Sequence, residues 1–93
     1  MVHGWSELTL AVPDHVLCRS VGDDTVLLDL KQDEYFSLDA VGTRVWEGLV
    51  ARRSLGDIVT SIATAYGVAV ERVETDVRAL LESLMQNGLL GAP

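Results

Sequence analysis

The stretch VLLDLKQDEYFSLD, residues 26–39, limits the fold more than any other part of the sequence. Two short runs of strand-forming residues, 25–30 and 35–38, flank the polar turn KQDE. Asp39 follows the second run and stands where a helix N-cap belongs, ahead of an apolar pattern with helical spacing. The second strand therefore runs straight into a helix, and its open side, along EYFSL at residues 34–38, has no pairing partner in view.

A further run with strand composition, HVLCRS at residues 15–20, precedes the other two. The turn VGDD joins it to residues 25–30 with the Gly and Asp residues that are typical of a hairpin. Three short strands joined by tight turns predict an antiparallel meander whose last strand has a free edge. Side chains alternate between the faces of the middle strand, and we expect its core face to consist of Val26, Leu28 and Leu30.

Helical periodicity occupies the rest of the chain. The first helix is expected after Asp39, over AVGTRVWEGLVAR, and the second begins behind a Ser54 cap and ends at Gly67. The third spans about residues 70–87 and ends at Gly88. Together these elements predict an α+β domain of the winged helix-turn-helix class, with a three-stranded antiparallel sheet followed by three helices.

The chain has 93 residues, which is enough for one small domain with a single core. We expect residues 13–93 to form that domain and residues 1–12 to form a flexible N-terminal arm. Pro13 interrupts strand pairing at the arm, and Trp5 is its only large anchor. No segment has the pattern of a secretion signal or the length of a membrane span, so we expect a soluble cytoplasmic protein without membrane contact.

Charge argues against nucleic acid as a partner. The formal net charge is -7, so the average surface repels phosphate. A winged helix raises the alternative of a DNA-binding regulator, whose last helix would enter the major groove. That helix carries two arginines, Arg72 and Arg78, against four carboxylates, whereas groove insertion needs positive charge.

The sequence offers no catalytic or metal-binding motif. His3, His15 and the single cysteine, Cys18, lack the spacing of a metal site. The glycines form no phosphate-binding loop, and the acidic residues around the turns lack the cleft that acid–base chemistry needs. We therefore expect a protein without enzymatic activity, cofactor or metal.

The open edge at residues 34–38, beside an amphipathic third helix, is the remaining candidate site. Unpaired backbone N–H and C=O groups can bind an extended peptide by strand addition, with alternate side chains entering pockets. On the residues alone, an equal alternative is that the N-terminal arm or a second copy of the chain covers this edge. We expect a monomer or a weakly associating homodimer.

Two long stretches resemble a known family. VLLDLKQDEYFSLDAVGTRVWEGL and SLGDIVTSIATAYGVAVERVETDVRALLESLMQNGLL are similar to the PqqD-like family, the recognition domains for ribosomally made, post-translationally modified peptides. The VLLDL strand, the YFSLD strand leading into a helix with VW, the YGV turn and the closing GLL carry the resemblance over roughly residues 13–90. Within the family, the chain is most similar to the stand-alone proteins of lasso-peptide biosynthesis.

This resemblance implies a non-enzymatic protein that binds the leader segment of a precursor peptide. Such a protein presents the leader to separate enzymes, a leader protease and an asparagine-synthetase-like cyclase. An alternative within the family is a peptide chaperone for another modified-peptide pathway, for example one with a radical enzyme as partner.

The resemblance also implies where the leader binds, as a strand beside the third strand and against the third helix. The strand residues carried over are Glu34, Tyr35, Phe36, Ser37 and Leu38. The helix residues carried over as the groove wall are Val73, Asp76, Val77 and Leu80. The same periodicity also fits the opposite flank of the helix, and the residues alone do not choose between the two flanks. The opposite flank consists of Glu74, Arg78, Leu81 and Met85.

Overall fold

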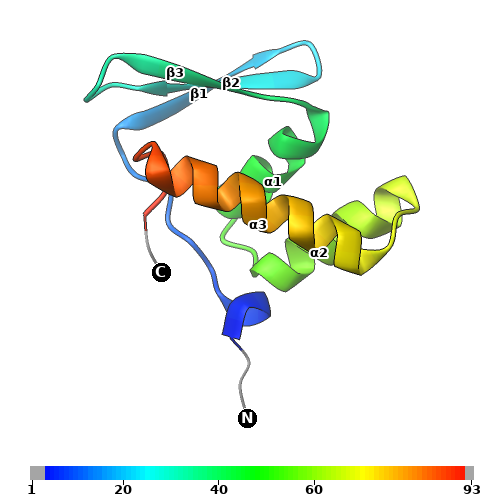
Figure 1. Ribbon diagram of the computed structural model, residues 1–93. Helices are drawn as coiled ribbons and strands as arrows, with labels where there is room; N and C mark the ends of the chain where they lie inside the picture. The colour runs from blue at the N-terminus through cyan, green and yellow to red at the C-terminus, as the bar shows by residue number, and fades with distance from the viewer. Residues whose placement is uncertain (1–3, 92–93) are drawn as a thin grey trace.

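The computed structural model describes residues 4–91 and shows a sheet on one side and helices on the other (Figure 1). The expected order of three strands followed by three helices is confirmed. The elements are a 3-10 helix η1 (Gly4–Glu7), the strands β1 (Val16–Val21), β2 (Asp24–Asp29) and β3 (Glu34–Leu38), and the helices α1 (Ala40–Val50), α2 (Leu55–Tyr66) and α3 (Val70–Gln86).

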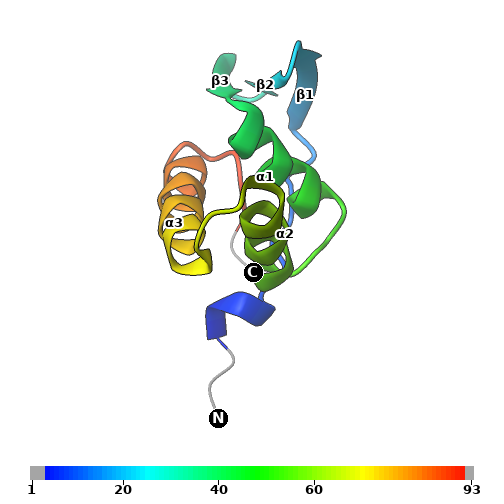
Figure 2. The ribbon, with the colours of Figure 1, turned by 90° about the vertical axis from the view of Figure 1, so that its right-hand side faces the viewer.

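The sheet is an antiparallel meander in the order β1-β2-β3. Val21 pairs with Asp24 across a two-residue turn, where Gly22 has a φ of 64°. A positive φ at the first central position suits glycine and matches the twist of a hairpin. The helices lie below one face of the sheet, as Figure 2 shows, and the other face is open. Both β1 and β3 are edge strands among the described residues.

The expected core face of β2 is wrong. Leu27 is fully buried, and Thr25 and Asp29 share its face, whereas Leu30 is 61% exposed. The strand ends at Asp29, so Leu30 belongs to the following turn rather than to the alternating pattern. The Asp29 carboxylate can be buried because it accepts hydrogen bonds from the backbone N–H groups of Lys31 and Gln32 in the turn that follows the strand.

Local signals fix the helix ends. The Asp39 carboxylate accepts a hydrogen bond of 2.8 Å from the Gly42 N–H, and the Ser54 hydroxyl accepts one of 3.2 Å from the Asp57 N–H. Gly67 ends α2 in the left-handed conformation. Because Asp39 caps α1 directly after β3, the first turn of α1 continues from the end of the open strand. No helix among residues 4–91 is long and apolar enough to cross a membrane.

Residues 4–12 of the N-terminal arm pack against the helices. Leu10 is 2% exposed, and the Leu55 N–H donates a hydrogen bond of 2.9 Å to the Leu8 carbonyl. The Trp5 ring lies over the Arg78 guanidinium at 4.3 Å. This part of the arm thus adds to the core, while the flexibility expected for residues 1–12 stays a prediction; residues 1–3 lie outside the described residues.

Candidate functional site: a groove between the third strand and the third helix

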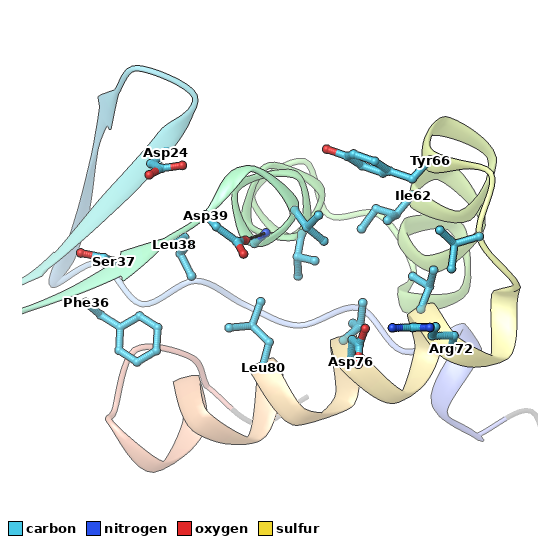
Figure 3. Close-up of a pocket in the computed structure, with 16 residues that line it drawn as sticks. Asp24, Phe36, Ser37, Leu38, Asp39, Ile62, Tyr66, Arg72, Asp76 and Leu80 are labelled. Atoms are coloured by element: carbon cyan, nitrogen blue, oxygen red, sulfur yellow. Dashed lines mark hydrogen bonds between the residues drawn. The ribbon is translucent and has the colours of Figure 1, made fainter.

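A groove of about 1060 Å³ runs between β3 and α1 on one side and α3 on the other (Figure 3). The C-terminal end of α2 lies at its far end. Most of its lining is apolar, and several side chains are shared between the groove and the core: Leu38, Val45, Ile62, Val73 and Val77. The groove is therefore a continuation of the core that the described chain leaves uncovered.

All four helix residues expected on the groove wall line this groove. Val73 and Val77 are buried at its base, Leu80 is half-buried, and Asp76 is exposed at the rim. In Figure 3, Leu80 points up from α3 toward the side of Phe36 and Leu38. The structure thus places these four residues on the groove side of α3, with Leu80 nearest to β3, although their role in binding a peptide stays a prediction.

The opposite flank of α3 has other contacts. Arg78 forms an ion pair of 3.0 Å with Glu74 and lies under the Trp5 ring of the arm. Leu81 is buried in the core, and Met85 is exposed away from the groove. In the structure the arm lies against this flank and the groove lies along the other, while the flank that contacts a leader stays a prediction.

The five strand residues divide into two groups. Phe36, Ser37 and Leu38 line the groove, and Figure 3 shows Phe36 directed toward α3 and Ser37 directed away from it. Glu34 and Tyr35 instead line a hollow of about 20 Å³ beside the end of α3. Tyr35 is 73% exposed on the face of the sheet that turns away from the helices.

The sheet register identifies the backbone groups that face the open edge of β3. The two-residue turn makes Val21 and Asp24 a hydrogen-bonded pair, and such pairs alternate along antiparallel strands. The bond of 2.9 Å from the Leu30 N–H to the His15 carbonyl continues this alternation. In β2, the even-numbered residues therefore bond to β1 and the odd-numbered residues bond to β3.

Applied to β3, this alternation separates inner from outer groups. Phe36 lies opposite Leu27 and directs its backbone groups toward β2. Tyr35 and Ser37 direct theirs outward. An added strand would thus pair with Tyr35 and Ser37, while the Phe36 side chain contributes to the groove.

A contact between the residue before β1 and the turn after α3 ties the helix to the sheet. His15 Nε2 lies 3.2 Å from the Gly88 carbonyl oxygen and 3.9 Å from the buried Asp29 carboxylate. Gly88 follows α3, so this contact fixes where the helix ends relative to the sheet. This contact thus helps to hold the end of α3 beside the sheet.

Sequence reasoning missed the wall formed by α1 and α2. Val41, Tyr66 and Val68 are exposed apolar residues that line the groove, and Arg44 lies 5.5 Å from the Tyr66 ring. Their exposure was the missing signal, since helical periodicity marks core residues but does not show which apolar residues the core leaves uncovered. The charged lining residues Asp24, Asp39 and Arg72 were missed as well.

The groove has the chemistry of a binding site. Its apolar base can bury side chains of a peptide, and the free edge of β3 can satisfy the backbone of that peptide. No group of three or more His, Cys, Asp or Glu side chains within residues 4–91 could hold a metal ion.

Comparisons with known proteins point in the same direction. Residues 24–90 match the family model described as coenzyme PQQ synthesis protein D (PqqD). A solved structure, TbiB1 in complex with the TbiA(beta) leader peptide, is 36% identical, with a TM-score of 0.84 over 89% of this chain and 96% of that chain. A second, lasso peptide synthetase B1 complexed with the leader peptide, has the same fold, with 24% identity and a TM-score of 0.84 over 91% of this chain and 100% of that chain. No curated protein sequence is significantly similar.

Proposed function

Because this chain belongs to the PqqD family, we propose that its groove receives the leader segment of a ribosomally synthesised, post-translationally modified peptide. The observation that carries the proposal is the edge of β3, which no strand within residues 4–91 pairs with, beside an apolar groove. The similar structure TbiB1 was solved in complex with a leader peptide, which supports the same kind of ligand here.

The leader adds to the sheet as a strand along β3. Its backbone pairs with Tyr35 and Ser37, and its alternate side chains enter the groove between Phe36 and Leu80. Val73 and Val77 form the apolar base, Leu38 closes the sheet side, and Asp76 lies at the rim. Glu34 flanks the end of the added strand. Backbone pairing supplies affinity without reading sequence, so specificity comes from these side chains.

We further propose that the pathway produces a lasso peptide. The chain then acts in the cytoplasm as a non-enzymatic monomer or weakly associating homodimer. It presents the bound leader to a separate leader protease and an asparagine-synthetase-like cyclase, and it uses no cofactor. The name of the second similar structure supports this assignment. The family description supports a second candidate, a peptide chaperone in a pathway such as cofactor synthesis with a radical enzyme as partner.

Fluorescence anisotropy tests the proposal directly. The probe is a fluorescein-labelled leader, taken from a short precursor gene sought near the gene for this chain and titrated with the purified protein. We expect saturable binding with a Kd in the micromolar range or tighter, and no binding of a scrambled leader of the same composition. A folded protein that binds neither peptide would contradict the proposed function.

A further inference from the structure

Four charged residues lie along the groove, and carboxylates outnumber the single cation. They are Asp24, Asp39, Asp76 and Arg72. The Asp39 carboxylate already has one partner, because its Oδ1 accepts the hydrogen bond from the Gly42 N–H that caps α1. Among the described residues, the side chains of Asp76 and Arg72 form no ion pair and no hydrogen bond, so both charges are available to a ligand.

Arg72, Asp76 and Leu80 follow one another along the groove side of α3 at intervals of four residues. Four residues of α-helix advance about 6 Å. Two residues of a β-strand advance about 6.6 Å, and alternate residues point to the same face. If an added strand continues along α3, its successive groove-facing side chains would therefore meet Leu80, Asp76 and Arg72 in turn. Figure 3 shows this order along α3, from Leu80 near Phe36 to Arg72 at the end where Tyr66 lies.

The sheet side of the groove adds two carboxylates. Thr25 pairs with Leu38, so Asp24 and Asp39 lie one position farther along the two neighbouring strands. In Figure 3, Asp39 lies on the α1 side of the groove and Asp76 on the α3 side. The groove thus carries carboxylates on both of its walls.

On these observations we infer that the groove selects its leader by charge as well as by shape, a conclusion that rests on the proposed function. The bound segment carries an apolar residue beside Leu80. Two residues farther along, toward Arg72, it carries a basic residue that pairs with Asp76. Asp76 is exposed at the rim, so this ion pair contributes a modest attraction that salt screens. The net charge of -7 also favours the approach of a basic peptide.

A charge scan of the leader tests this inference. Each residue of the fluorescein-labelled precursor leader is replaced in turn by Lys, Glu and Ala, and each Kd is measured by anisotropy at about 50 and 300 mM salt. At one position, two residues from an apolar anchor, we expect Lys to bind about tenfold more tightly than Glu, as a charge-assisted contact predicts. Higher salt should shrink this difference.

Substitution of Asp76 assigns the preference to that residue. Asp76→Asn should reduce the preference for Lys to about twofold, and Asp76→Lys should reverse it. Glu82→Lys is the matched control, because Glu82 lies exposed on the same helix outside the groove and should leave the preference unchanged. Circular dichroism melting verifies that each variant folds.

The outcomes separate this inference from the proposed function. If the parent leader binds saturably but the difference between Lys and Glu is the same in wild type, Asp76→Lys and Glu82→Lys, the charge selection is refuted while leader binding stands. If no position distinguishes Lys from Glu, the inference is refuted as well. If the parent leader does not bind the folded wild-type protein, the proposed function itself fails.

Discussion

The two edges of the sheet differ in what lies beside them. β1 and β3 both leave backbone groups unpaired among the described residues, and both carry a serine whose N–H points outward, Ser20 and Ser37. Five of the six residues of β1 are exposed, and no β1 residue lines the groove. β3 instead lies next to an apolar groove and faces α3. A free edge offers hydrogen bonds to any extended chain, so the neighbouring apolar wall is what makes one edge selective.

Replacing each of these two serines by proline should give the largest difference in leader affinity between the two edges. Ser37→Pro removes an outward N–H of β3 and places a ring where a leader backbone would lie, whereas Ser20→Pro makes the same change on β1. We expect leader affinity to fall at least about thirtyfold for Ser37→Pro and less than about twofold for Ser20→Pro. Anisotropy with the labelled leader measures both.

Folding must be followed in the same experiment. Neither proline removes a bond of the existing sheet, so both variants should keep a cooperative thermal transition. Phe36→Pro, by contrast, would delete a bond between β3 and β2 and should destabilise the protein. Equal loss of leader binding in Ser37→Pro and Ser20→Pro would contradict the assignment of the leader to β3.

Shortening an apolar side chain on α3 tests whether this helix forms the groove wall, with a smaller expected effect on leader affinity. Leu80→Ala shortens a half-buried side chain in the groove, and Met85→Ala shortens an exposed one outside it. Burial of about two methylene groups against a leader contributes about 1.5 kcal/mol, so we expect Leu80→Ala to weaken leader binding about tenfold. Met85→Ala should leave the Kd unchanged. Similar Kd values for the two variants would exclude this flank as the wall.

The opposite flank of α3 gives the smallest expected effect on binding. Trp5→Ala removes the contact with Arg78, which should lower the free energy of unfolding by about 1 kcal/mol or more. Leader affinity should stay within about twofold of wild type, because this flank does not line the groove. Urea unfolding and anisotropy on one sample measure both quantities. Strong loss of binding without loss of stability would mean that the arm takes part in recognition.

The elements were predictable because their signals are local. Asp39 and Ser54 start helices with their own side chains, and Gly67 ends one through its own φ. The buried face of β2 was not predictable from the sequence. Three alternating apolar residues, including Leu30, suggested the wrong face, and the sequence does not show that the Asp29 carboxylate is buried with hydrogen bonds from the following turn.

The site was predictable in part for a related reason. Periodicity placed Val73 and Val77 on an apolar stripe, yet both flanks of that stripe have the same spacing. The difference between the flanks comes from tertiary contacts, with Trp5 over Arg78 on one side and an uncovered groove on the other. The α1 and α2 wall depends likewise on how the helices pack, which no local pattern reports.

Residue-resolved amide hydrogen exchange by NMR, with and without the precursor leader, tests the central claim most directly. Strand addition at β3 predicts that the amides of Tyr35 and Ser37 exchange at least about tenfold more slowly in the complex. The amides of Cys18 and Ser20 on β1 should exchange at their rates in the free protein. Saturable leader binding with protection at Cys18 and Ser20, or with no protection at Tyr35 and Ser37, would contradict the account.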